Sequence, residues 1–461
     1  MAFLDKKYLL DSKISQQIYS EIKNLPIIDA HNHADIKEIA NNTGWQDIWE
    51  VEAATDHYVW ELMRKRGVPE EKITGKASNC KKWKALCEIF PDIATNPTYE
   101  WIHLDLKRRF GINKLICSEN ADEIWEETRQ ALNKDSFKPQ PLLKDMNVEI
   151  LCTTDDPVLS LPFHEKASQD LNNIKILPTW RPDKISNINS NSWNSDIKDL
   201  SEETNINLED INDLMRTLEK THSYFNRLGC VASDHGVEQP YAYHVSKNTA
   251  DKIFQKAVNN KSLTREEISN FQAFLMHYYA ELNSQTNWVM QIHIGAVRDY
   301  RDKLKNNLGP DSGGDISTQN IEIAKNLKAL LNSFDEKLKI VLYCLDPTHL
   351  PTVSTIARAF PNVSIGAAWW FNDSPVGMEN HLEYISSVDL MRNFAGMVTD
   401  SRKLMSYGSR TEMFRRVLAN VLGKMVNRGQ VPMEIAENLA KAVTYDRPKE
   451  LFFNSIKLSK K

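Results

Sequence analysis

The sequence has 461 residues, of which 41% are hydrophobic and 26% are charged, and its formal net charge is −5. This length supports a large hydrophobic core, and the weak negative charge argues against a nucleic-acid partner, which usually requires a basic surface. No apolar run approaches the length of a membrane span and the N-terminus lacks a cleavable apolar leader, so we expect a cytoplasmic protein with no membrane partner.

Short apolar runs rich in β-branched residues alternate along the chain with segments of helical character. Eight such runs occur, at residues 25–33, 148–155, 174–182, 229–236, 288–295, 339–347, 362–372 and 394–401. This alternation is typical of βα units around a parallel sheet. Within each run a His, Asp, Arg or Trp follows the apolar residues, which favours a (β/α)8 barrel with its chemistry at the C-terminal strand ends. A doubly wound open sheet is the alternative, but it would not need reactive residues at so many strand ends.

More than a hundred residues separate the first run from the second, which is far more than one crossover helix requires. Residues 34–146 have helical character and are rich in aromatic side chains, so we predict a helical insertion over the barrel mouth. The expected organisation is a helix and first strand in 1–33, this insertion in 34–146, and the remaining barrel and C-terminal helices in 147–461. The Asn- and Ser-rich segment 184–204 is predicted to be a surface loop.

Two histidines end the first run. Residues two apart in a strand point to the same side, so His31 and His33 should both face the barrel interior. Their spacing suits two imidazole ligands on one divalent ion, although histidines also serve as ordinary hydrogen-bonded residues. His293 ends the fifth run and Asp400 the eighth, and a barrel would bring all four side chains to a common centre. We therefore predict a metal site formed by His31, His33 and Asp400, with His293 as the next candidate.

Charged residues follow several other runs. Arg181 follows the third run, Asp234 ends the fourth, Arg298 comes shortly after the fifth, and Arg402 follows Asp400 by two residues. Two or three arginines around one cleft suit an anionic substrate, because a guanidinium group can hold a carboxylate through two parallel hydrogen bonds. For any single arginine, a salt bridge on the rim is the alternative.

Two aromatic pairs have open interpretations. His57 and Tyr58 lie on a predicted amphipathic helix of the insertion, where they could simply be half-buried packing residues. As part of a lid over a metal centre, they could instead supply an acid/base tyrosine and a histidine that contacts substrate hydroxyls. Of Trp369 and Trp370, one ring is expected to face the barrel interior as the wall of a sugar-sized pocket, and the other to pack outward.

Nine motifs together resemble those of the uronate isomerase (glucuronate isomerase) family, a divergent branch of the amidohydrolase superfamily. In chain order they are DAHNH, DHYVWELMRKRGV, CTTDDP, PTWRPDK, SDHG, MQIHIGAVRD, LGPDSGGD, WWFND and MVTDSRKLMSY. They cover nearly the whole chain. One departure is Asn32, where the family often has Cys, but this side chain should point away from the metal.

The resemblance implies a distorted (β/α)8 barrel of the metal-dependent hydrolase type. It implies an aldose–ketose isomerase of hexuronate catabolism that interconverts D-glucuronate with D-fructuronate, and D-galacturonate with D-tagaturonate. It also implies one divalent ion, usually zinc, at His31, His33 and Asp400, with His293 at the position of the superfamily's strand-five ligand. A homo-oligomer is expected for a metabolic enzyme of this type.

By the same matching, we expect catalytic roles for Tyr58, His57, Asp400 and Arg402, and substrate contacts for Arg181, Asp234, Arg298 and Trp369. The expected mechanism is ring opening assisted by Asp400 and the metal. Proton transfer from C2 to C1 through an enediol then follows, with Tyr58 as the base and with Arg181 and Arg402 offsetting negative charge. The alternative is a metal-dependent hydrolase of the same superfamily, acting on an ester, amide or lactone, in which Asp400 activates a metal-bound water.

Overall fold

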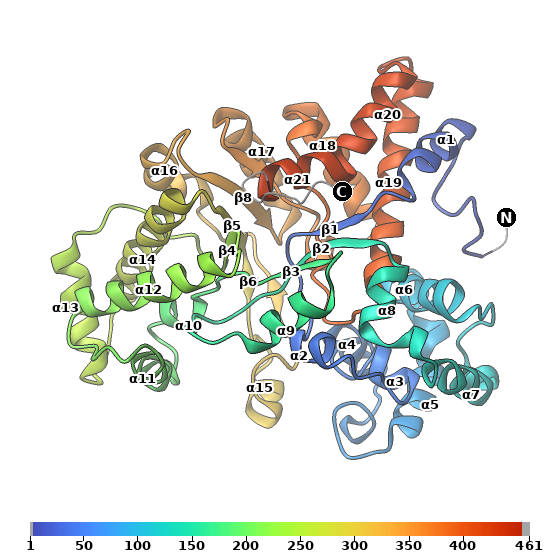
Figure 1. The fold of residues 1–461 in the computed structure, drawn as a ribbon, viewed down its shortest axis with the longest axis horizontal. Helices are drawn as coiled ribbons and strands as arrows, with labels where there is room; N and C mark the ends of the chain where they lie inside the picture. Colours follow the sequence, from blue (N-terminus) through green and yellow to red (C-terminus); the bar gives the residue numbers. More distant parts are fainter. Residues whose placement is uncertain (1–2, 454–461) are drawn as a thin grey trace.

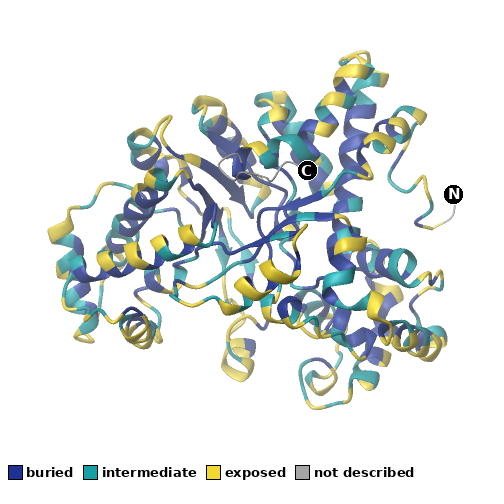
Figure 2. Ribbon diagram, in the orientation of Figure 1, coloured by how far each residue is buried: buried dark blue, intermediate teal, exposed yellow. Residues whose placement is uncertain are grey.

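The computed structural model describes residues 3–453, in which parallel strands occupy the interior and helices surround them (Figure 1). The strands are β1 (Ile27–Asp29), β2 (Val148–Cys152), β3 (Lys175–Leu177), β4 (Ala232–Val237), β5 (Val289–Ile294), β6 (Ala296–Val297), β7 (Ile316–Ser317), β8 (Lys339–Cys344) and β9 (Val363–Ile365). The predicted α/β class with parallel strands is confirmed. The strands of the parallel sheets are mostly buried at the centre of the molecule, as Figure 2 shows, whereas β6 and β7 are only partly buried.

The parallel strands form two sheets, one in the order β1-β2-β3 and the other in the order β4-β5-β8-β9. Isolated parallel bridges from Trp180 to Asp155 and to Ser233 connect the chain after β3 with β2 on one side and β4 on the other. Strands β6 and β7 form a separate antiparallel pair that follows β5 and was not expected from the sequence.

The eighth predicted strand, residues 394–401, is not a strand in the structure. The segment still lies between the two sheets, because Ala395 N–H donates to the carbonyl of Ile365 and Asp400 N–H donates to that of His31. Gly396 has a φ of 105° and Asp400 a φ of 49°, so the backbone leaves the extended region at two points. These left-handed positions prevent a continuous ladder.

The chain between β1 and β2 is helical, and it lies at the lower right of Figure 1. Its helices are α2 (Ile36–Asn41), α3 (Ile48–Glu52), α4 (His57–Lys65), α5 (Asn79–Ile89), α6 (Pro97–Asp105), α7 (Ala121–Leu132) and α8 (Pro139–Asp145). A separate hydrophobic core, which includes Trp83, Leu86 and Phe90, draws its buried residues entirely from positions 48–124. This part of the chain therefore packs largely around its own apolar side chains.

The remaining helices surround the strands or pack at the C-terminal end of the chain. They are α1 (Lys13–Ile22), α9 (Pro162–Asp170), α10 (Asp183–Ser186), α11 (Trp193–Thr204), α12 (Ile211–Arg227), α13 (Lys247–Val258), α14 (Arg265–Thr286), α15 (Asp302–Leu308), α16 (Ile323–Ser333), α17 (Leu350–Ala359), α18 (Pro375–Val388), α19 (Ser406–Asn427), α20 (Met433–Lys441) and α21 (Arg447–Phe453). Within residues 3–453, no helix combines the length and the apolar composition that a membrane span requires.

The prediction of a surface loop at 184–204 is wrong, because α10 and α11 occupy most of this segment. Trp193, Ile197 and Leu200 recur at helical spacing and are buried on one face of α11. Burial of this face outweighs the turn-forming Asn and Ser composition around it.

Candidate active site

The ends of several strands and the start of α4 surround a cavity of about 190 Å³. Ten of the eleven residues singled out from the sequence line it, namely His31, His33, His57, Tyr58, Arg181, His293, Arg298, Trp369, Asp400 and Arg402. The eleventh, Asp234, is fully buried beside the cavity and contacts three of the ten. The structure thus brings together residues that are up to 371 positions apart in the sequence.

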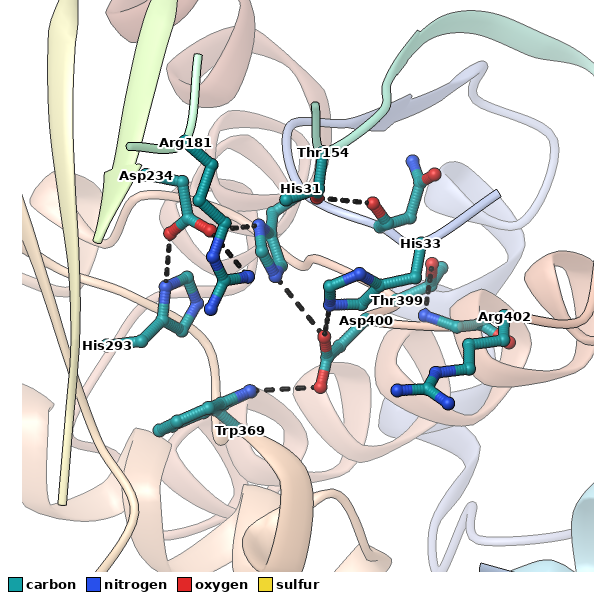
Figure 3. Close-up of polar contacts among 12 residues, drawn as sticks. His31, His33, Thr154, Arg181, Asp234, His293, Trp369, Thr399, Asp400 and Arg402 are labelled. Carbon is teal, nitrogen blue, oxygen red and sulfur yellow. Dashed lines mark hydrogen bonds and ion pairs between the residues drawn. The ribbon is translucent and has the colours of Figure 1, made fainter. Parts of the chain in front are cut away.

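Asp400 lies at the centre of this site (Figure 3). Its Oδ1 is 3.2 Å from Nε2 of His31 and 3.2 Å from Nε2 of His33, and its Oδ2 accepts a hydrogen bond of 2.9 Å from the indole N–H of Trp369. Burial alone would raise the pKa of Asp400, but the contacts with the two histidines hold it well below its usual range. The carboxylate is therefore ionised.

Asp29, the last residue of β1, fixes the position of Asp400 through its side chain. The buried carboxylate of Asp29 accepts a hydrogen bond from Thr399 N–H at 3.1 Å and another from the Thr399 hydroxyl. The next residue, Asp400, has a left-handed φ of 49°, which is uncommon for a residue other than glycine and is often found at functional sites. Asp29 thus anchors the turn that directs the Asp400 side chain toward the histidines.

A second charged group lies on the other side of His31. Asp234 Oδ1 is 2.7 Å from Nδ1 of His293, and its Oδ2 is 3.6 Å from Nδ1 of His31 and 3.0 Å from Nη1 of Arg181. Burial opposes ionisation of Asp234, but Arg181 and the two histidines hold its pKa well below the ordinary value. Burial lowers the pKa of His293 to about 4, so this ring is neutral.

The residues present fit a divalent metal ion. One ligand atom each from His31, His33 and Asp400 lie within 4.8 Å of one another, and the same holds for His31, Asp234 and His293. Two imidazoles and a carboxylate are a common ligand set for zinc and related ions. Nε2 of His293 is buried without a hydrogen-bond partner, as a free donor atom for a ligand would be. His31 belongs to both groups: its Nε2 faces Asp400 and its Nδ1 faces Asp234. Nε2 would be the ligand atom for an ion beside Asp400, and Asp234 would then orient the ring through Nδ1.

His57 and Tyr58 form the first turn of α4 and reach the cavity from the helical segment. Asp56 caps this helix, and its Oδ1 accepts a hydrogen bond of 2.9 Å from Tyr58 N–H. The Tyr58 hydroxyl is buried without a hydrogen-bond partner. Burial and the Asp400 charge raise the pKa of Tyr58 well above its ordinary value, while Arg410 opposes this shift. In this environment Tyr58 retains its proton.

The arginines of the cavity differ in how strongly they are paired. Arg181 is held by Asp183 at 2.6 Å and by the buried Asp234 at 3.0 Å. By contrast, among residues 3–453 Arg402 has a single ion pair, of 3.5 Å with Asp311, whose side chain is 65% exposed. Arg402 is therefore the easier of the two to reorient toward an anionic ligand.

Some lining residues were missed in the sequence, namely Asp56, Asp311, Ser401 and Arg410. Arg410 is 1% exposed, pairs with Asp373 at 2.9 Å, and lies 3.9 Å above the ring of Trp101. It belongs to α19, which is buried on nearly every side. Helical periodicity in the sequence therefore does not show which residues of α19 face the cavity.

The expectation that only one of Trp369 and Trp370 faces inward is wrong, because both line the cavity. Strand alternation does not apply here, since Trp370 begins a short 3-10 helix and has a φ of 55°. Its ring stacks on His57 at a centroid distance of 5.6 Å, and the guanidinium of Arg298 lies 4.4 Å from its centroid.

Comparison with known proteins identifies the family. The family model described as glucuronate isomerase matches residues 1–452. The chain belongs to the glucuronate isomerase family. Among its relatives, the uronate isomerase of Thermotoga neapolitana is 57% identical over 98% of this chain and 100% of its own length. The crystal structure of uronate isomerase from Thermotoga maritima has a TM-score of 0.96 at 56% identity, covering 98% of this chain and 100% of that one.

A more distant member of the family keeps the same fold. The crystal structure of glucuronate isomerase from Caulobacter crescentus covers 100% of this chain and 98% of its own at 26% identity, with a TM-score of 0.94. The resemblance inferred from the sequence motifs is thereby confirmed. The residues that line the cavity described above all lie within the matched residues 1–452.

Proposed function

We propose that this isomerase interconverts D-glucuronate with D-fructuronate, and D-galacturonate with D-tagaturonate. The observation that carries the proposal is the placement of Asp400, Tyr58 and Arg402 around one cavity in a chain that matches the family over its full length. A hexuronate needs an anion-binding group for its carboxylate and a proton-transfer group for its carbon chain, and these residues supply both.

Arg402 is the proposed partner of the substrate carboxylate. It lines the cavity, and within the described part of the chain its one ion-pair partner is the exposed Asp311, at 3.5 Å. A planar carboxylate offers a guanidinium two parallel hydrogen bonds, which the single contact with Asp311 does not. Arg181 remains paired with Asp183 and Asp234, so it contributes a fixed positive charge that offsets an enediolate.

The reaction begins with the cyclic sugar. Asp400 accepts the proton of the C1 hydroxyl as the C1–O5 bond breaks and returns that proton to O5, which gives the open aldehyde and leaves Asp400 ionised. The Tyr58 phenolate then takes the proton from C2 and later delivers it to C1, while a proton passes from the C2 oxygen to the C1 oxygen. The aldehyde thereby becomes the ketose through the enediol. A neutral tyrosine is a poor base, and burial raises the pKa of Tyr58. Tyr58 must therefore lose its proton within the substrate complex before it can act as the base at C2.

His31, His33 and Asp400 would hold one divalent ion, for which we propose zinc, with His293 nearby. When bound, this ion would polarise and orient a sugar oxygen. Trp369 keeps Oδ2 of Asp400 directed by its hydrogen bond. The ring of Trp369 and the stacked pair of His57 and Trp370 supply the apolar walls that exclude water.

The proposal extends to the architecture and the setting of the enzyme. The two parallel sheets and residues 394–401 together form a distorted (β/α)8 barrel, which is supported by the bridges at Trp180 and the hydrogen bonds of Ala395 and Asp400. Within the expected units 1–33 and 147–461, the described residues 3–33 and 147–453 form this barrel with its flanking helices. Residues 34–146 form the helical insertion that covers its mouth. We further propose a cytoplasmic homo-oligomer that acts on free hexuronates.

The deciding experiment is a paired assay of the metal-loaded enzyme. Incubation with D-glucuronate and with D-galacturonate should produce the corresponding ketoses, measured by a coupled ketose reduction. The same enzyme should release no acid from sugar lactones, esters or amides. Acid release without ketose formation would instead identify a metal-dependent hydrolase, in which Asp400 activates water.

A further inference from the structure

Lys403 is a buried lysine to which the proposed mechanism gives no role. Its side chain is 2% exposed, and Nζ lies 3.0 Å from Oδ2 of Asp56 and 3.4 Å from Oε2 of Glu52. Both carboxylates are buried as well. Asp56 lines the cavity, whereas Lys403 and Glu52 do not, so the lysine acts from behind the cavity wall.

Asp56 connects this ion pair to the start of α4. Its Oδ1 accepts the backbone N–H of Tyr58 at 2.9 Å as the helix N-cap, and its Oδ2 faces Lys403. One oxygen therefore holds the helical turn that carries His57 and Tyr58, and the other holds the lysine.

The backbone at Lys403 is fixed relative to Asp400. Lys403 N–H donates to Oγ of Ser401 at 3.1 Å, and the Ser401 carbonyl accepts a hydrogen bond of 3.1 Å from His33 N–H. Asp400 N–H in turn donates to the His31 carbonyl at 3.2 Å. Lys403 thus belongs to a loop that is tied to the end of β1.

We propose that Lys403 is a positioning residue for the isomerisation, and that its ion pair with Asp56 holds His57 and Tyr58 at a fixed distance from Asp400. This inference rests on the proposed function. The free-energy cost of removing two charges from water offsets most of their attraction, so such a pair contributes little net stability. The pair nevertheless favours the one relative position of the two segments in which the charges meet. Val51 of the helical segment shares an apolar core with Leu404 and Met405, the residues that follow Lys403. The buried ion pair adds a charged contact between the same two parts of the chain, next to the residues that line the cavity.

The test is the double variant Lys403→Met/Glu52→Gln, studied as the full-length, metal-loaded enzyme. Methionine keeps the length of the lysine without its charge, and glutamine removes a carboxylate that would otherwise be left unpaired. Asp56 remains able to cap α4. Because misplacement of a reacting group by about 1 Å lowers rates by roughly a hundredfold, we expect kcat for D-glucuronate to fall at least about 30-fold. KM should change by less than about threefold and metal content should stay unchanged.

Two control variants separate positioning from stability. Glu52→Gln alone keeps the Lys403–Asp56 pair and should leave kcat within about twofold. Glu412→Gln removes ion pairs with Arg108 and Arg416 away from the cavity, so it should lower Tm without a selective loss of kcat. A double variant with the kcat of the unmodified enzyme would overturn the proposal, as would a loss of kcat that Glu412→Gln reproduces at an equal fall in Tm.

Amide hydrogen exchange provides a readout that does not depend on turnover. Exchange of residues 57–61 should become faster in the double variant, and the other helices of the 34–146 segment should be unaffected. Unchanged exchange at 57–61 would overturn the positioning role. Absence of turnover by the unmodified enzyme on any hexuronate would instead remove the proposed function, while the exchange result would still report on the link between Lys403 and Asp56.

Discussion

The indole N–H of Trp369 donates a hydrogen bond of 2.9 Å to Oδ2 of Asp400, the carboxylate whose other oxygen faces two histidines. Trp369→Phe removes this donor and keeps an aromatic ring. A hydrogen bond to a charged group contributes about 1.5–3 kcal/mol, so kcat/KM should fall about tenfold to a hundredfold. Phe371→Leu, at an exposed neighbouring position, is the control and should leave kcat/KM unchanged. Equal kinetics for the two variants would show that the indole donor is dispensable.

Activity should depend on a bound metal ion, and binding of this ion should depend on His33. Exhaustive chelation should abolish ketose formation, and readdition of zinc should restore it. His33→Asn removes one imidazole from the candidate ligand set and should reduce metal content, measured by elemental analysis after dialysis, to well under one ion per chain. Replacement of His164, a buried histidine outside the cavity, by Asn should leave metal content intact. Full activity after verified metal removal would argue against a catalytic ion.

Tyr58→Phe should separate substrate binding from proton transfer. The hydroxyl has no hydrogen-bond partner among the residues that the structure describes, so its removal leaves none of their polar groups unpaired. We expect exchange of the C2 hydrogen of glucuronate with solvent deuterium, followed by NMR, to slow by about a hundredfold or more, because general acid–base groups contribute about 10²–10⁴-fold. Exchange at the rate of the unmodified enzyme would exclude Tyr58 as the C2 base.

Arg402→Met should weaken binding of the substrate carboxylate. Loss of a charge-assisted contact of about 1.5–3 kcal/mol predicts a rise in KM for D-glucuronate of about tenfold or more. Inhibition by a neutral hexose, which lacks the carboxylate, should change little. The matched control is Arg66→Met, which removes an exposed ion pair with Asp92 and should leave KM unaltered. An unchanged KM in Arg402→Met would assign the carboxylate to another arginine.

Stability should decrease in mild acid because of histidines that are buried in the neutral form. Burial lowers the pKa of His222 and of His381 to about 4. Since an unfolded histidine titrates near 6.5, the unfolded chain binds protons between about pH 6.5 and 4 that the folded chain does not. The stabilisation is therefore present above pH 6.5 and is lost as the pH falls. His381→Gln should flatten this slope by about 1.4 kcal/mol per pH unit in urea titrations at pH 6 and pH 5. An unchanged slope would show that His381 is not neutral when folded.

Much of the fold could be predicted because strand runs in a parallel sheet are continuously apolar and end in polar residues. This signal failed at 394–401, where the left-handed Gly396 and Asp400 interrupt an otherwise extended segment. A different signal, the Asn and Ser composition, wrongly predicted a loop at α11, which has a buried face that includes Trp193. The β6–β7 pair has two residues per strand, which is too short for any periodicity.

The candidate site could be predicted where residues end a strand run, as His31, His33 and Asp400 do. Arg410 could not, because its position in the cavity depends on how α19 packs against α6 rather than on any local pattern. The expectation that only one of Trp369 and Trp370 faces inward was wrong because the backbone turns at Trp370, which has a φ of 55°. Such errors arise where tertiary contacts or a local turn override the regular alternation of a strand.

Residues 48–124 contain a hydrophobic core that draws no buried residue from the strands. Substitutions within α4 would be accommodated mainly by side chains that pack in the same core. The histidines and the aspartate at the strand ends are held by other contacts. Such a division would let side chains of the helical segment change while the strand-end residues keep their positions. It also gives protein engineers a segment whose sequence can be diversified while the strand-end residues are kept constant.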